Sequence, residues 1–233
     1  MKKKLAALLV GAMLTFATSA MADVLYVGSN FTGNGNPAIL GTWDGSAVQW
    51  GGGSMDVSTL TSSLGTRTLP YLYCVDVFND VPVGNYYSQT SVNYSGQIHG
   101  STLNNADKVA FLVQNYGANS GQTDQARALQ AAIWTEIYST GQSHTYTLNS
   151  DAYGSNSNIV GLYNTYIDAA KNVSTTGYAS HVTWINPDNG SGTVYQGLVT
   201  SGPVPEPSTI VLLVTGMLGM AVFGKRRMIK TAQ

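Results

Sequence analysis

The clearest strand signal of this chain is Tyr71-Leu72-Tyr73-Cys74-Val75-Asp76-Val77-Phe78. The stretch is rich in aromatic and β-branched residues, which favour extended structure. Because side chains alternate along a strand, Cys74 shares one face with Leu72, Asp76 and Phe78. Both faces are largely apolar, so we predict a central strand of a sheet rather than an edge strand.

Helical periodicity follows this strand. Apolar residues recur at helical spacing from Val109 to Tyr116, and Gly117 ends the pattern. A second helix is predicted to start after Thr123 or Asp124 and to run to about Tyr138, and a third runs from about Ser157 to Lys171. Further strand signals are 24–27, 86–94, 181–185 and 193–200, with Gly/Asn/Ser-rich loops over the rest of 23–53. Strands on both sides of a helical block predict an α+β domain, with an antiparallel or barrel-like sheet and about three helices.

The charges of the chain are segregated. The net charge is −1 over 233 residues, but most cations lie at the two ends. Between Asp23 and Pro203 there are eleven carboxylates, and the cations are Arg67, Lys108, Arg127 and Lys171. Since the body has no basic patch that could neutralise phosphates, we expect no nucleic-acid partner.

The N-terminal segment has the pattern of a secretory signal. Lys2-Lys3-Lys4 precedes an apolar run from Leu5 to about Thr18, and Ala20-Met21-Ala22 forms a small-x-small cleavage site. We expect a signal peptide at 1–22 and a mature chain that begins at Asp23.

The C-terminal segment has the pattern of a membrane anchor. A Gly/Pro linker at 201–208 precedes an apolar run at 209–224, close to the lower limit of about 17 residues for a spanning helix. Lys225-Arg226-Arg227 follows at once. The positive-inside rule therefore puts the basic tail 225–233 in the cytoplasm and the body 23–200 outside it.

The order of these C-terminal features resembles the PEP-CTERM sorting signal of Gram-negative bacteria. The motif is Val204-Pro205-Glu206-Pro207-Ser208, followed by the apolar helix and the basic cluster. The resemblance implies that Pro205, Glu206, Pro207, Lys225, Arg226 and Arg227 form the signal. It also implies an exosortase-like membrane transpeptidase as a partner, a transient anchor in the inner membrane, and a final place on the cell surface or in the extracellular matrix. The alternative is a permanent anchor.

Cys74 is the single cysteine of an exported chain, where disulfides are favoured and none can form within it. One reading is a buried, inert thiol. A second residue also stands out, because Gln130 lies beside the apolar stripe that includes Leu129 and Ile133. A buried glutamine must be hydrogen-bonded, or it costs about 1–3 kcal/mol.

Two motifs together resemble the Cys-Gln thioester domain of bacterial surface adhesins. They are Tyr73-Cys74-Val75-Asp76 on a strand and Leu129-Gln130-Ala131-Ala132-Ile133-Trp134 on a later helix. The resemblance covers about 71–138 and implies that Cys74 supplies the sulfur and Gln130 the acyl carbon of an internal thioester. Supporting side chains are Tyr73, Asp76, Ile133 and Trp134, and we expect Phe78 to help exclude water. Asp76 either opposes thiolate formation or acts protonated or as a base.

The chemistry that the resemblance implies is single-use, so we do not expect an enzyme. An amine or hydroxyl of a surface protein or polysaccharide would attack the Gln130 carbonyl and release Cys74. The alternative is a non-covalent structural or polysaccharide-binding matrix protein in which Cys74 is inert. We expect no cofactor and no metal, because His99, His144 and His181 lack ligand spacing. A secreted hydrolase has no supporting motif.

Overall fold

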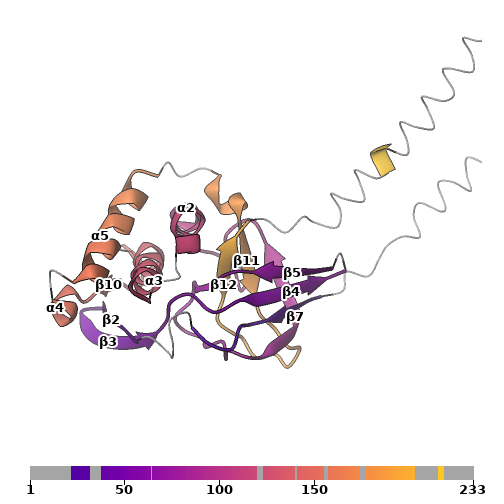
Figure 1. Cartoon of the computed structure of the whole chain (residues 1–233), viewed down its shortest axis with the longest axis horizontal. Coiled ribbons are helices and arrows are strands. Elements are labelled where there is room, and N and C mark those ends of the chain that lie inside the picture. The colour runs from indigo at the N-terminus through magenta and orange to yellow at the C-terminus, as the bar shows by residue number, and fades with distance from the viewer. Residues whose placement is uncertain are drawn as a thin grey trace, which may run out of the picture.

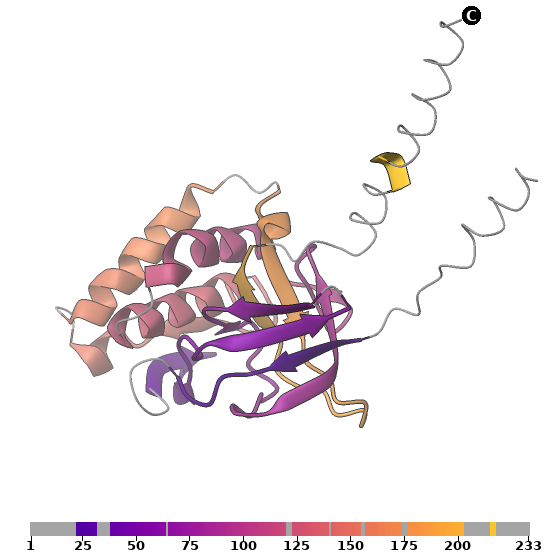
Figure 2. The same cartoon turned by 45° about the vertical axis from the view of Figure 1, so that its right-hand side comes forward.

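The computed structural model describes residues 22–31, 38–63, 65–119, 123–139, 141–154, 157–173, 177–202 and 215–217. A layer of helices packs against an antiparallel half-barrel sheet (Figures 1 and 2). The sheet has seven strands in the order β5-β4-β1-β7-β11-β12-β6. Their bounds are Gly65–Leu69, Ser58–Ser62, Asp23–Tyr26, Tyr86–Asn93, Val182–Asn186, Leu198–Ser201 and Tyr73–Cys74. The predicted α+β fold is confirmed.

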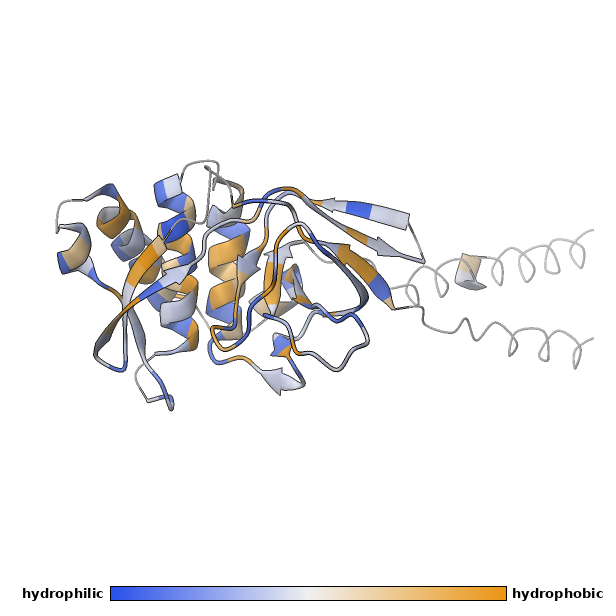
Figure 3. Ribbon diagram, turned by 90° about the horizontal axis from the view of Figure 1, so that it is seen from below, coloured by the Kyte–Doolittle hydropathy of each residue, from blue (hydrophilic) through white to orange (hydrophobic). Residues whose placement is uncertain are grey.

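Three long helices form the second layer. They are α2 (Ala106–Tyr116), α3 (Thr123–Ile137) and α5 (Asn158–Lys171), and the shorter elements are η1 (Gly117–Asn119), α4 (Ser150–Tyr153) and η2 (Tyr178–His181). The helical periodicity of the sequence predicted α3 and α5 to within two residues, whereas the apolar pattern of α2 begins at Val109, three residues after the helix starts. Hydrophobic residues, orange in Figure 3, occur on both the helices and the strands, and those at their contact form one core.

Helix α3 is the centre of the helical layer. It packs against both α2 and α5, and also against β10 and β2. Ten of its 15 residues are buried, among them four alanines whose small side chains allow neighbouring elements to approach closely. This burial on nearly all sides places Gln130 in the interior of the domain.

A second sheet covers the other side of α3, and the sequence interpretation missed it. Its strands are β2 (Ala38–Trp43), β3 (Ser46–Gly51) and β10 (Tyr146–Leu148), in the order β10-β2-β3. Asp44 and Gly45 join β2 to β3 with φ values of 49° and 80°, and both values lie in the left-handed region. An Asp-Gly pair suits such a two-residue hairpin turn. The prediction of loops over this segment was therefore wrong.

The strand predicted over 71–78 is shorter and differently placed. Only Tyr73 and Cys74 form β6, which is an edge strand of the seven-stranded sheet. The prediction of a central strand was wrong because helix α3, rather than another strand, buries the open edge. The strand ends soon after Cys74 because the Asp76 carboxylate accepts a hydrogen bond from the Phe78 N–H at 2.7 Å, which turns the chain.

Three of the remaining strand predictions are confirmed, and the fourth only in part. The signals at 24–27, 86–94 and 181–185 correspond to β1, β7 and β11 within one residue, whereas only the last three residues of 193–200 lie in β12. A small hairpin of β8 (Gln97–Ile98) and β9 (Ser101–Thr102) was not predicted. The hairpin formed by β4 and β5 was also not predicted from the sequence.

The terminal segments lie almost wholly outside the described residues. This applies to the predicted signal peptide, the Pro205-Glu206-Pro207 motif and the basic tail, whereas 215–217 form a short piece of helix. No helix within the described ranges combines the length and hydrophobicity that crossing a bilayer requires. The domain boundaries proposed from the sequence stay predictions.

Candidate functional site

The side-chain carboxamide of Gln130, on α3, makes hydrogen bonds to the open edge of strand β6. The Cys74 N–H donates to Gln130 Oε1 at 2.9 Å, and Gln130 Nε2 donates to the Cys74 carbonyl oxygen at 2.7 Å. The carboxamide thus replaces a neighbouring strand. On the other side of β6, Val75 donates its N–H to the Gly197 carbonyl oxygen at 2.9 Å. The two residues predicted to react are therefore held together by reciprocal hydrogen bonds.

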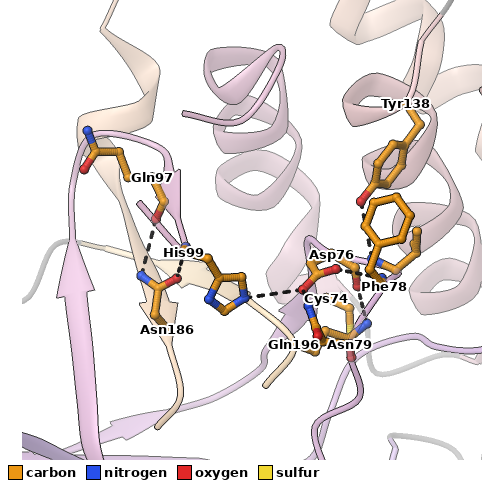
Figure 4. A network of polar contacts seen from close by, with 10 residues as sticks. Cys74, Asp76, Phe78, Asn79, Gln97, His99, Tyr138, Asn186 and Gln196 are labelled. Carbon is orange, nitrogen blue, oxygen red and sulfur yellow. Dashed lines mark hydrogen bonds and ion pairs between the residues drawn. The ribbon is translucent and has the colours of Figure 1, made fainter. Parts of the chain in front are cut away.

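The Cys74 thiol has a separate partner. Sγ donates to Gln196 Oε1 at 2.9 Å, and Gln196 Nε2 donates to the Asp76 carbonyl oxygen (Figure 4). Gln196 lies in the segment before β12 and bridges the sulfur to the backbone two residues further along. Since the thiol proton points to Gln196, this contact sets the orientation of the sulfur. The sequence offered no signal for this residue.

The surroundings favour the neutral thiol. Cys74 is 1% exposed and Gln130 is fully buried. Burial, and then the negative charges of Asp76 and Asp80, raise the pKa of the Cys74 thiol well above its usual range. The sequence-based suggestion that Asp76 opposes thiolate formation fits this direction. Any attack by the sulfur therefore needs a base that removes the thiol proton.

Asp76 organises the turn that follows β6. Its side chain is 8% exposed. Oδ2 accepts from Asn79 Nδ2 at 2.8 Å and lies 3.4 Å from His99 Nε2 (Figure 4). Tyr138, at the end of α3, accepts the Val77 N–H at 3.3 Å. The turn is consequently tied to α3 and to the β8–β9 hairpin.

Aromatic and small residues enclose the carboxamide. Ile133 and Tyr73 have no exposed surface and Trp134 is 1% exposed, so the predicted apolar neighbours are buried at the site. Gly52 approaches closely, because a Cβ built there would lie 3.0 Å from Gln130 Cγ and 2.8 Å from the Trp134 ring. Gly52 follows the hairpin that the sequence interpretation missed, so its role was missed as well.

Phe78 does not exclude water from the site. Its side chain is 64% exposed, which corrects the expectation that it covers the reacting groups. The chain has left the sheet by this point, so strand alternation no longer applies to it. Phe78 instead lines a cavity of about 520 Å³ that begins at Val75 and Asp76 and extends to His99 and Tyr138.

No metal ligand set is present in the part of the chain that the structure describes. There, no three histidine, cysteine, aspartate or glutamate side chains gather closely enough to hold an ion. The polar groups of the site are amides, one thiol, one carboxylate and one imidazole. These are groups for acyl and proton transfer.

The comparison with protein families identifies the C-terminal signal. Residues 203–227 match the model of the PEP-CTERM protein-sorting motif. The motif implies export and cell-surface sorting in a Gram-negative bacterium, with exosortase-type processing. The resemblance drawn from the sequence is confirmed on this point.

Comparison with solved structures finds a thioester domain. It is the N-terminal thioester domain of a protein F2 like fibronectin-binding protein from Streptococcus pneumoniae, with 11% identity and a TM-score of 0.37. The match covers 78% of this chain and 96% of that domain. No curated protein matches the sequence. The chemistry proposed below rests on the contacts of Cys74 and Gln130 themselves.

Proposed function

We propose that this exported surface protein forms an internal thioester between Cys74 and Gln130 and uses it once, to attach covalently to a partner. The observation that carries the proposal is the pair of reciprocal hydrogen bonds between the Gln130 carboxamide and the Cys74 backbone. Any buried glutamine needs hydrogen-bond partners. Here both partners are backbone groups of Cys74, the single cysteine of the chain, which is a specific arrangement. The sorting motif supports a location on the cell surface, where a covalent attachment to a partner is useful.

The first step joins the two side chains. The Cys74 sulfur, once deprotonated, attacks Gln130 Cδ; the C–S bond forms, the C–N bond breaks, and Nε2 leaves with the thiol proton as ammonia. The Cys74 N–H already donates to Oε1 at 2.9 Å, so it stabilises the negative charge that develops there. The fixed carboxamide supplies the proximity that makes the reaction intramolecular.

The second step transfers the acyl group. A nucleophile of the partner attacks the same carbon, and the sulfur leaves and regains a proton as the Cys74 thiol. The buried shell of Tyr73, Ile133 and Trp134 keeps water from the activated carbonyl until then. Each molecule reacts once, so the protein is not an enzyme in the catalytic sense.

Intact mass measurement tests the thioester. The purified protein should be lighter than its sequence mass by one ammonia, whereas Cys74→Ser, whose hydroxyl is a poorer nucleophile, should show its full mass. Methylamine should add to the Gln130 acyl carbon as an N-methyl amide, which is heavier than the sequence mass by one methylene group, and should release one thiol. A wild-type protein at full sequence mass would contradict the proposal, provided that Cys74→Ser shows the same folded spectrum.

The alternative function is non-covalent. Burial and the contact with Gln196 also suit an inert thiol, in a structural or polysaccharide-binding matrix protein. This alternative predicts a full-mass protein in which Cys74 resists alkylation until denaturation and then titrates as one thiol.

A further inference from the structure

The cavity beside the candidate thioester has the size and lining of a ligand site. Its volume of about 520 Å³ lies in the range of small-molecule pockets. Its lining includes the two residues that directly follow Cys74 in the chain, whereas Cys74 and Gln130 themselves lie behind this lining. Its polar lining is mostly amide and hydroxyl groups, including Asn79, Asn104 and Gln142. These groups suit a ligand that carries many hydroxyls.

His99 is the first residue of the two-residue turn that joins β8 to β9. Its φ of 51° and the φ of 78° at Gly100 lie in the left-handed region, as such a hairpin turn requires. The His99 N–H donates to Asn186 Oδ1 at 2.9 Å, and Asn186 Nδ2 donates to the Gln97 carbonyl oxygen at 3.4 Å (Figure 4). Two strands therefore fix the conformation of this residue.

The His99 ring is oriented by Asp76. Nε2 lies 3.4 Å from Asp76 Oδ2, and the side chain is 29% exposed, so solvent reaches the ring. A carboxylate at Nε2 holds the ring proton on that nitrogen, which leaves Nδ1 as a proton acceptor. His144 and Tyr138 also line this cavity, and Asp188 lines an adjoining cavity that shares His99.

An aromatic surface forms the rim. Phe78 is 64% exposed, yet its ring is held edge-on by Trp43, Tyr138 and His144 with centroids 5.8, 5.9 and 5.7 Å away. An exposed ring that is fixed in this way offers its apolar face to a ligand. The C–H faces of sugar rings stack on such surfaces, while their hydroxyls bind nearby amides. The lining and the rim thus favour the same class of ligand.

We propose that this cavity binds a sugar unit of a polysaccharide as the acceptor, and that His99, oriented by Asp76, takes the proton of the attacking hydroxyl. The inference rests on the proposed thioester and names its acceptor. The hydroxyl oxygen bonds to the Gln130 acyl carbon and the C–S bond breaks. The proton passes to His99 Nδ1 and then to the Cys74 thiolate, so the products are an ester and a thiol.

The first experiment tests the reaction. The purified protein is incubated with methyl glucoside or with methylamine, and adducts and released thiol are measured by intact mass and thiol titration. His99→Gln should slow glucoside addition about 100-fold, the loss of one general base. It should slow methylamine much less, because a neutral amine attacks before it loses its proton. His181→Gln, at an exposed histidine of η2, is the matched control and should react as wild type.

The second experiment tests binding without the thioester. Cys74→Ser is titrated with a panel of neutral hexose oligosaccharides by calorimetry, and Phe78→Ala in that background should weaken binding at least tenfold. Tyr86→Ala removes another aromatic side chain, 70% exposed, and should leave affinity unchanged.

The two experiments separate the proposals. A protein at full mass that still binds oligosaccharide through Phe78 supports the sugar site and contradicts the thioester. A thioester that reacts only with amines, or whose glucoside addition is unaffected by His99→Gln, overturns the inference and leaves the proposed function intact. Oligosaccharide affinity that is undetectable, or independent of Phe78, overturns it as well.

Discussion

Replacing Gln130 with glutamate makes the stability of the domain depend on pH. The variant retains an acceptor for the Cys74 N–H, and when protonated it can also donate to the Cys74 carbonyl oxygen, as the amide does at 2.7 Å. When ionised it places an unpaired charge against that oxygen in a fully buried position. The folded state therefore raises the pKa of the new carboxyl.

The magnitude follows from burial. Full burial shifts carboxyl pKa values upward by as much as 3–5 units, and each unit corresponds to about 1.36 kcal/mol. A shift of about 3 units makes the variant roughly 4 kcal/mol less stable at pH 8 than at pH 4, relative to its parent. Because folding raises the pKa of the new carboxyl, its contribution to the stability of the domain is fully present below the unfolded pKa. This contribution is lost as the pH rises through the folded pKa. Such a loss approaches the whole stability of a small domain.

Urea unfolding measures this effect. The Cys74→Ser background prevents acyl chemistry, and Gln130→Glu is compared with Gln49→Glu, which makes the same change at an exposed position of β3. We expect the free energy of unfolding of Gln130→Glu alone to fall between pH 4 and pH 8. Equal pH dependence in the two variants would refute the argument that Gln130 is buried against the Cys74 backbone.

Three further predictions concern the same region. Gly52→Ala should destabilise the domain by about 1–3 kcal/mol in urea unfolding, because the new Cβ meets the Trp134 ring, whereas Gly161→Ala on α5 enters open space and should not destabilise it. In full-mass protein, iodoacetamide should alkylate native Cys74 only at strongly alkaline pH, because burial raises the thiol pKa; modification at neutral pH would contradict this. Burial raises the pKa of Tyr138 to about 12, so stability should decline as the pH rises from about 10 to 12, and Tyr138→Phe should reduce this decline in alkaline unfolding curves.

Sequence patterns predicted the helices and strands that form because of the spacing of apolar and turn residues within one segment. The three long helices follow from apolar residues at 3.6-residue periodicity, and β7 from a run bounded by turn residues. The prediction for 71–78 failed because composition indicates an extended chain but not its neighbour. Here α3 and the Asp76 turn, both tertiary features, end the pairing after Cys74. The β2–β3 hairpin was missed although Asp44-Gly45 is a recognisable turn pair.

The sequence by itself determined the sorting motif, the order of the main helices and strands, and the candidacy of Cys74 and Gln130. Only the tertiary structure decided that these two residues, 56 positions apart, share two hydrogen bonds. It alone brought in Gln196, which is 122 positions from Cys74. Only the tertiary structure places His99 beside Asp76 and leaves Phe78 exposed. The physical reason is that periodicity reports which face of an element is buried, whereas a polar side chain selects its partner through the packing of distant segments.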